Sequence, residues 1–110
     1  MGMRAPSLSD QDLEQLTALF HLLSDKTRLN ILMILCEGER NVTALCEILS
    51  LPQPTVSHHL GLLRMHNVIG SRRAGKQVFY GLNGRVDISD ATSLSIALEK
   101  VAVRIAAKSA

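Results

Sequence analysis

Apolar side chains recur at helical spacing through the first third of the chain. One set follows at steps of three, four and three residues: Leu13, Leu16, Phe20 and Leu23. This spacing predicts an amphipathic helix over about 9–23. The apolar run at 29–35 has little polar face, so we expect a second, more central helix, which Gly38 ends.

The pattern then predicts two shorter helices joined by a turn. Asn41 can cap the first of them, whose apolar residues stand at i, i+3, i+4 and i+7: Val42, Leu45, Cys46 and Leu49. The turn covers 50–52, and Pro54 suits the first turn of the next helix, 53–66, where a missing N–H breaks no helical bond. The buried side of that helix is formed by Val56, Leu60 and Leu63. Two short helices joined in this way are typical of a helix-turn-helix.

Beyond Asn67 the apolar residues alternate with polar ones, as they do in strands. Residues 69–73 and 77–82 predict a hairpin around Ala74-Gly75-Lys76, and a ribbon in this position makes a helix-turn-helix winged. Near the end of the chain, helical spacing returns at steps of four, three and four: Leu94, Leu98, Val101 and Ile105. We expect a last helix over about 89–107 that is capped near Ser89 or Asp90.

These elements together predict one winged helix-turn-helix domain over 1–110, mainly α with a small β-hairpin. The chain has 110 residues, the length of one domain, and with two Phe, one Tyr and no Trp its core must be aliphatic. No apolar run approaches a membrane span and no apolar leader precedes Ser7, so we expect neither a membrane segment nor an export signal. Two cysteines without such a signal favour reduced thiols and a cytoplasmic protein.

The charged residues are segregated along the chain. Residues 1–47 hold four basic and seven acidic side chains, a balance of −3, and residues 87–110 hold three of each. Residues 48–86 hold five basic side chains and no acidic one, a balance of +5: Arg64, Arg72, Arg73, Lys76 and Arg85. A basic, acid-free segment predicts a polyanionic partner, which for this fold is double-stranded DNA.

The second helix of the predicted helix-turn-helix carries side chains that suit a major groove. They are Gln53, Thr55, Ser57 and His58. Each is short or able to hydrogen-bond, so the set can read base edges or bind phosphates, and Gly61 lets the backbone approach. Plain exposure to solvent is the alternative interpretation. Arg64, at the end of the helix, can bind a phosphate or complement the helix dipole.

The hairpin tip and one histidine complete the candidate interface. Arg72, Arg73 and Lys76 flank the tip with no acid to pair with, which favours contacts to phosphates or to a minor groove. His59 lies near the buried stripe of its helix, so we expect a structural histidine rather than a reader of bases.

Three stretches of the chain resemble the ArsR/SmtB family of bacterial winged-helix repressors. They are Leu23-Ser24-Asp25-Lys26-Thr27-Arg28-Leu29 at the second helix, Gln53-Pro54-Thr55-Val56-Ser57-His58-His59-Leu60 with Leu63-Arg64 at the recognition helix, and Arg73-Ala74-Gly75-Lys76 with Tyr80 and Leu82 at the wing. The resemblance implies a repressor that a small signal releases from DNA. It also implies a homodimer paired through the first and last helices, about 9–23 and 89–107, and two-fold symmetry then requires an inverted-repeat operator.

The signal itself does not carry over from the family. The cysteine pair that metal-sensing members hold in the third helix corresponds here to Asn41 and Thr43, and residues 87–110 contain no His or Cys. We therefore predict no metal site and no cofactor, and the inducer and the target genes stay open. Cys36 and Cys46 are candidates for a thiol switch, and packing in the core is the alternative.

Two other classes of function are less compatible with the sequence. An enzyme is not expected, because the neighbouring Ser57 and His58 point about 100° apart on a helix and no other catalytic constellation is present. A winged-helix module that binds a protein would not need the acid-free segment 48–86. Repression and activation are not distinguished by the residues alone.

Overall fold

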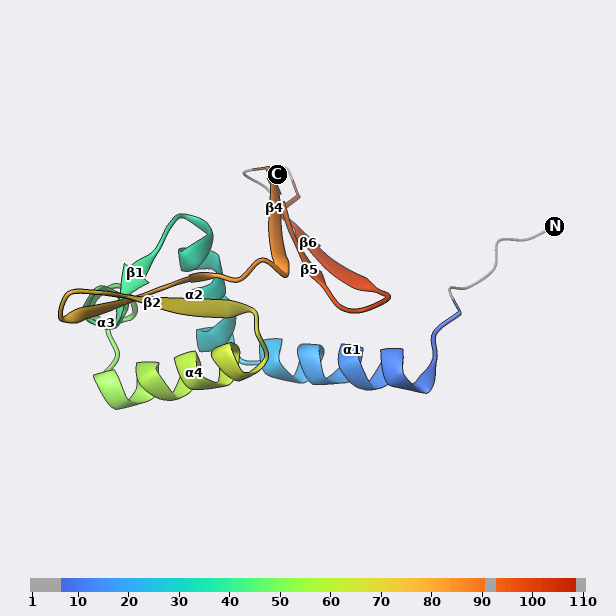
Figure 1. The fold of residues 1–110 in the computed structure, drawn as a ribbon, viewed down its shortest axis with the longest axis horizontal. Helices are drawn as coiled ribbons and strands as arrows, with labels where there is room; N and C mark the ends of the chain where they lie inside the picture. Colours follow the sequence, from blue (N-terminus) through green and yellow to red (C-terminus); the bar gives the residue numbers. More distant parts are fainter. Residues whose placement is uncertain (1–6, 91–92, 109–110) are drawn as a thin grey trace.

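Four helices and two small sheets make up the computed structural model, which describes residues 7–90 and 93–108 (Figure 1). The helices are α1 (Asp10–Leu23), α2 (Lys26–Cys36), α3 (Val42–Leu49) and α4 (Gln53–Met65). All four lie where the apolar spacing predicts them. With the hairpin that follows α4, they confirm the winged helix-turn-helix.

Polar side chains at the starts of three helices fix their first residues. Ser9 and Asp12 form a capping box at α1, in which each side chain accepts the other's backbone N–H, at 3.1 and 3.0 Å. Asp25 accepts the N–H of Arg28 at the start of α2, at 3.0 Å. Asn41 accepts the N–H of Ala44 at the start of α3, at 2.8 Å. Side chains close by in the sequence therefore determine where these three helices begin.

The wing consists of β2 (Ile69–Ala74) and β3 (Gln77–Leu82), which pair antiparallel. The tip is tighter than the predicted three-residue connection, because Ala74 pairs with Gln77 and only two residues turn. Gly75 opens that turn with a φ of 64°, a conformation that favours glycine. A short strand that the sequence did not predict, β1 (Arg40–Asn41), pairs with β3 on its other side. It ties the wing to the start of α3.

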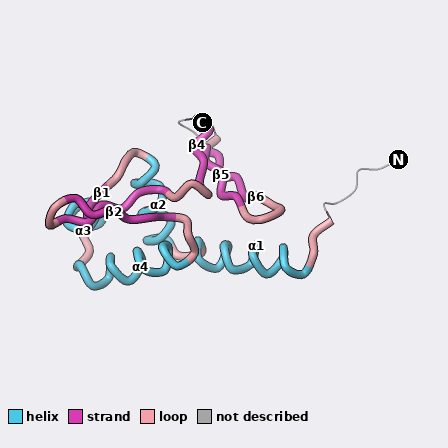
Figure 2. Tube along the Cα trace, viewed as in Figure 1, coloured by secondary structure: helices cyan, strands magenta, loops and turns pink. Residues whose placement is uncertain are grey.

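The prediction of a last helix over 89–107 is wrong. The chain instead forms three antiparallel strands, β4 (Val86–Asp90), β5 (Ser93–Ala97) and β6 (Ala102–Ala106), in the order β4-β5-β6. We call this sheet the C-terminal meander. Figure 2 shows it apart from the wing. Ser89 and Asp90, the expected caps, belong to β4, and their side chains lie outside the described part of the structure.

Helical and strand spacings of apolar residues coincide in this segment, and the predicted helix took account of the helical spacing alone. The helical seam left out Ile96 and Val103, which alternate with Ser95 and Arg104 as strand residues do. Alternation gathers one apolar face in the meander: Val86, Leu94, Ile96, Val103 and Ile105 all belong to or pack against the core. β-Branched side chains favour extended backbone over helix, and they dominate this face.

The core lies between α2, α3, α4 and the start of the wing. Its most buried side chains are Ile31, Leu32, Leu45, Val56, Leu60, Leu63, Val68, Ile69 and Ile96. Helix α1 joins this core through Leu19 and Leu22, each 4% exposed. Two members of its predicted apolar seam, Leu13 and Phe20, remain 46% and 54% exposed instead.

Helix α1 also projects away from the rest of the molecule (Figure 1). Leu13 and Phe20 stand seven residues apart, so they lie on one side of α1 and leave an exposed apolar surface along it. Among the described helices, none is long and apolar enough to span a membrane.

Candidate nucleic-acid interface

Helix α4 buries one side and leaves the other polar and open. Val56, Leu60 and Leu63 are buried in the core, as predicted. Outside this buried stripe Gln53, Ser57, His58 and Arg64 are exposed, and Thr55 is half-buried. In the described structure the side chains of Gln53, Thr55 and Ser57 make no hydrogen bond within the chain. Their donors and acceptors are therefore available to another molecule.

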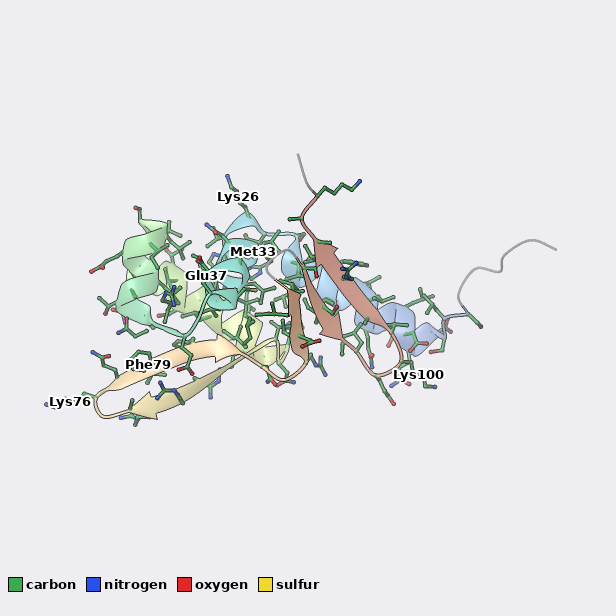
Figure 3. The ribbon with its side chains drawn as sticks, turned by 90° about the horizontal axis from the view of Figure 1, so that it is seen from above. Lys26, Met33, Glu37, Lys76, Phe79 and Lys100 are labelled. Atoms are coloured by element: carbon green, nitrogen blue, oxygen red, sulfur yellow. The ribbon has the colours of Figure 1, made fainter. Side chains whose placement is uncertain are left out.

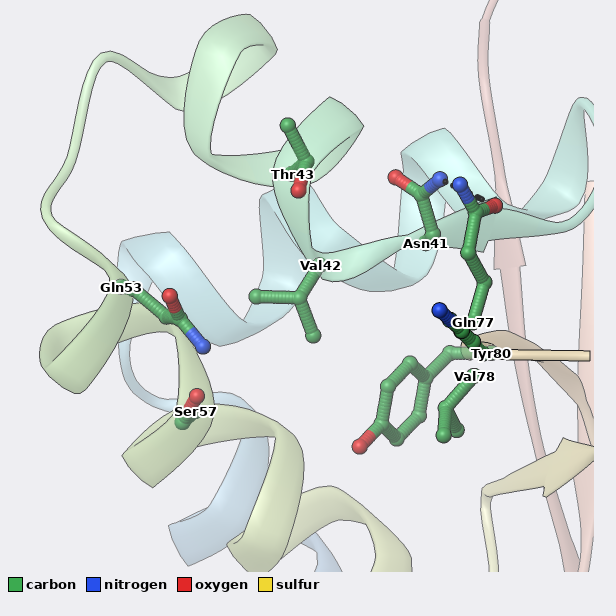
Figure 4. Close-up of a pocket in the computed structure, with 9 residues that line it drawn as sticks. Asn41, Val42, Thr43, Gln53, Ser57, Gln77, Val78 and Tyr80 are labelled. Carbon is green, nitrogen blue, oxygen red and sulfur yellow. Dashed lines mark hydrogen bonds between the residues drawn. The ribbon is translucent and has the colours of Figure 1, made fainter. Parts of the chain in front are cut away.

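The start of α4, the start of α3 and the wing enclose a concave surface with a volume of about 340 Å³ (Figure 4). Its lining residues are Asn41, Val42, Thr43, Gln53, Ser57, Lys76, Gln77, Val78 and Tyr80. The fold thus brings together three residues that the sequence singled out, Gln53, Ser57 and Lys76. Thr55, His58, Arg64 and Arg73 lie outside this lining.

Sequence reasoning missed the contribution of α3 and of the wing strand. Thr43 stands in the first turn of α3, and Gln77 accepts a 3.1 Å hydrogen bond from the Asn41 side chain across the wing. The first helix of a helix-turn-helix crosses the DNA backbone, so the position of Thr43 in that helix could have marked it as a candidate for the interface. Gln77 gave no such signal, since its partner is far away in the sequence.

The three basic wing residues differ in their partners. Lys76 stands at the tip of the hairpin (Figure 3), and neither it nor Arg73 has an ion-pair partner among the described residues. The expectation that no acid pairs with Arg72 is wrong. Its Nε lies 2.9 and 3.0 Å from the two carboxylate oxygens of Glu39, and its Nη2 lies 2.8 Å from Oε1. The acid comes from outside the basic segment, which is why the sequence hid it.

This ion pair changes the electrostatics of the wing. The hydrogen bond from Arg72 lowers the pKa of Glu39, and the same contact raises the pKa of Arg72. The Arg72 guanidinium also lies 5.0 Å from the centre of the Phe79 ring. With one of its five charges neutralised by Glu39, segment 48–86 keeps four basic side chains that form no ion pair with any residue the structure describes.

His59 is held inside the fold, in agreement with its expected structural role. Its Nδ1 lies 3.3 Å from Nη1 of Arg28, whose Nε donates to the Leu22 carbonyl at 2.7 Å. The carboxylate of Asp25 lies 4.0 Å from both side chains. The N–H of Arg28 lowers the pKa of Asp25, and the Arg28 charge lowers it further, against an opposing effect of burial. These contacts connect the end of α1 and the start of α2 to α4.

Comparison with known proteins identifies the family. The model of the bacterial regulatory proteins of the arsR family matches residues 25–69. The transcriptional repressor SdpR of Bacillus subtilis is 36% identical over 67 residues, which cover 61% of this chain and 74% of that protein. This chain belongs to the arsR family.

Two further relatives extend this result. The arsenical resistance operon repressor of Escherichia coli is 44% identical over 69 residues, covering 62% of this chain and 59% of that protein. A solution structure from Mycobacterium bovis, described as a homodimeric winged helix-turn-helix DNA-binding domain, matches with a TM-score of 0.62 and 29% identity over 73% of this chain and 77% of that one. Two of the curated relatives are matched over only 58% and 59% of their own length.

Membership of the arsR family bears on the remaining sequence predictions. A family of regulatory proteins confirms a regulator rather than an enzyme. In the described part of the chain, no three His, Cys, Asp or Glu side chains form a group that could hold a metal ion. Cys36 and Cys46 are free thiols that pack against the core, and burial, together with the charge of Glu37, raises the pKa of Cys36.

Proposed function

We propose that this arsR-family protein is a homodimeric transcriptional repressor that binds an inverted-repeat operator in double-stranded DNA. The observation that carries the proposal is the convergence of unpartnered polar side chains from α3 and α4 with Lys76 of the wing around one concave surface. The lining contains no acidic side chain, and Arg64 and Arg73, which lie outside it, have no acidic partner among the described residues; such a balance of charge suits a polyanion. Relatives described as repressors support the direction of regulation.

The proposed roles follow from where each side chain lies. The major groove is contacted by four residues of α4: Gln53, Thr55, Ser57 and His58. Thr55 is half-buried in the first turn of α4, so its hydroxyl is the part that can reach DNA. Arg64, Arg73 and Lys76 bind phosphates and set the orientation of α4. Thr43 joins them from α3.

In this proposal a second copy of the chain covers the exposed apolar side of α1, which carries Leu13 and Phe20. Leu13 and Phe20 are too large and too exposed for a surface without a partner, and a two-fold axis lets the same patch cover itself. The homodimer described for the Mycobacterium bovis relative supports this arrangement. The predicted contribution of a last helix falls away, because that segment is the C-terminal meander.

The dimer is testable without DNA. Changing Leu13 and Phe20 to Glu should convert a dimer to a monomer in sedimentation at micromolar concentration. The matched control is Ile48→Glu, which alters an apolar side chain of similar exposure on α3. A wild-type monomer, or dissociation by the Ile48 variant as well, would contradict the α1 interface.

We also propose a cytoplasmic protein whose inducer is not a metal ion. Zinc, cadmium or arsenite at stoichiometric amounts should leave DNA affinity unchanged. Both thiols pack against the core, and burial raises the pKa of Cys36, which favours packing over a thiol switch; the double variant Cys36→Ser/Cys46→Ser should therefore still repress. Metal-induced release, or oxidative release that the double variant abolishes, would overturn these points.

Fluorescence polarisation tests DNA binding directly. The probe is a labelled duplex with an inverted repeat from the region upstream of the protein's own gene, and a scrambled duplex of equal length is the control. Because bound phosphates release counterions, the affinity should fall steeply between 50 and 400 mM salt, concentrations chosen to span roughly one decade. A flat response would favour a protein-binding module instead, and equal affinity for both duplexes at every salt concentration would contradict the inverted-repeat operator.

A further inference from the structure

The wing presents two different faces. Side chains alternate across a strand, so the pairs Arg72–Phe79 and Arg73–Val78 point to opposite sides of the β2–β3 ribbon. Val78 and Tyr80 line the concave surface, and in Figure 4 the Tyr80 ring extends from β3 toward α4. Arg73 shares the face of Val78. The opposite, outer face carries Arg72, which lies outside that lining; of the β2 and β3 residues on the outer face, Gln77 alone lines the concave surface.

On that outer face, two strands of the wing and the residue before β1 form one cluster. Glu39 lies just before β1, and its side chain crosses β3 to reach Arg72 of β2. Its carboxylate oxygens lie 2.8–3.0 Å from the guanidinium nitrogens of Arg72, a two-point contact. Phe79 of β3 lies under the guanidinium. A two-point contact fixes the plane of an arginine as well as its position. The cluster therefore joins β2, the outer strand of the wing, to the segment just before β1.

Gly81 leaves room for the Glu39 side chain where it crosses β3. A methyl group at position 81 would lie 3.1 Å from Cγ of Glu39, tighter than an ordinary contact. Glycine weakens a strand interior, and it is usually found where another group comes close. In β3 the close group is Glu39.

We propose that Arg72 is a positioning residue that stiffens the wing through Glu39 and Phe79, and that it does not bind phosphate. Arg73 and Lys76 then form the phosphate-binding part of the wing. This division rests on the proposed DNA binding, which it refines. Arg72 differs from its neighbour Arg73 in the face it occupies and in its contacts with Glu39 and Phe79, so the two residues form a matched pair.

The experiment compares Arg72→Gln with Arg73→Gln in the salt series described above. Loss of one phosphate contact lowers the slope of log affinity against log salt by about 0.9 for each Arg73 lost. Arg72→Gln should leave the slope unchanged and weaken binding only about two- to fivefold, the range of an exposed ion pair. Arg72→Lys keeps the charge but loses the two-point contact, so it should behave like Arg72→Gln.

Glu39→Gln separates positioning from masking. If Glu39 orients Arg72, then Glu39→Gln should weaken binding as Arg72→Gln does, and the double variant should be no weaker than either single one. If Glu39 merely hides a phosphate ligand, the same variant should bind DNA more tightly with a steeper slope. That result overturns the proposal, as does wild-type behaviour of Arg72→Lys or a reduced slope in Arg72→Gln.

A measurement without DNA keeps this outcome distinct from failure of the proposed function. Amide hydrogen exchange in β2 and β3 should quicken in Arg72→Gln and Glu39→Gln and stay unchanged in Arg73→Gln. If wild-type protein binds no DNA but the exchange pattern holds, the stiffening stands and the proposed function fails. Equal exchange in all three variants overturns the stiffening.

Discussion

Helix α4 and the C-terminal meander show the same apolar spacing and fold differently. In α4 the buried residues Val56, Leu60 and Leu63 repeat at steps of four and three, and no alternation competes with them. In the meander an equally regular helical seam coincides with a period of two that includes more apolar residues. Apolar spacing therefore predicts a helix only where the strand period has been counted and found weaker.

The two segments also differ in what their polar sides can do. The polar side of α4 borders Lys76 across the concave surface, whereas that of the meander carries Asp87, Ser95 and Arg104, of both charges. Stability and recognition should therefore separate. Substitutions on the buried side of either segment should lower the free energy of unfolding, and those on the polar side of α4 alone should change DNA binding.

The largest expected effect tests the strand assignment. Ile96 is fully buried in β5, whereas Leu98 is half-buried after the strand ends. Ile96→Ala should lower the free energy of unfolding by about 2–5 kcal/mol in urea denaturation, because it removes methylene groups from the core and leaves a cavity. Leu98→Ala should cost clearly less. The predicted helix reverses this order, since Leu98 lies in its seam and Ile96 outside it.

A smaller effect concerns recognition. His58→Ala should weaken binding to the inverted-repeat duplex by about 1–3 kcal/mol and relax the preference over a scrambled duplex. The free energy of unfolding should change by less than about 0.5 kcal/mol, because His58 is exposed. Arg104→Ala on the meander is the control: it removes a positive charge from a different sheet, outside the lining of the concave surface, and should leave affinity and salt slope unchanged. Equal effects of both variants would contradict the separation.

Local signals explain why the region from α1 to the wing could be predicted. Capping side chains stand at Ser9, Asp25 and Asn41, and Gly75 turns the hairpin. The meander has no comparable marker: its second turn runs through Glu99 and Lys100, closed by a 2.8 Å bond from Leu98 N–H to the Val101 carbonyl. Charged residues there fit a helix equally well, so tertiary burial of the apolar face decided the outcome.

The candidate site was predictable in the same uneven way. Gln53, Ser57 and Lys76 could be chosen from residue type and position in the motif. The partners Glu39 for Arg72 and Gln77 for Asn41 are 33 and 36 residues away, so only the folded sheet brings them together. Charge counted along the sequence overestimated the free charge of the wing for this reason.

The capping signals themselves can be tested at Asn41. Asn41→Ala should lower the free energy of unfolding by about 1 kcal/mol, because the Ala44 N–H loses its acceptor. Asn41→Asp keeps that acceptor and loses the bond to Gln77, so it should remain close to wild type. If both variants are equally destabilised in urea denaturation, then the contact across the wing, rather than the cap, defines the start of α3.

The smallest expected effect is the pH dependence contributed by Asp25. Its pKa in the folded state lies below the ordinary value of 3.8, because the Arg28 N–H and the Arg28 charge favour the carboxylate. A lowered folded-state pKa stabilises the protein above pH 3.8, and this contribution is lost as the pH falls through the folded-state value. The free energy of unfolding should therefore decrease below about pH 4, and less steeply in Asp25→Asn, which keeps a capping side chain without a titrating group. Glu39→Gln should flatten the same range through the wing, since the pKa of Glu39 is lowered by Arg72. If neither variant changes the slope of stability against pH, the two ion pairs do not stabilise the fold, and their effect is confined to the geometry of α4 and the wing.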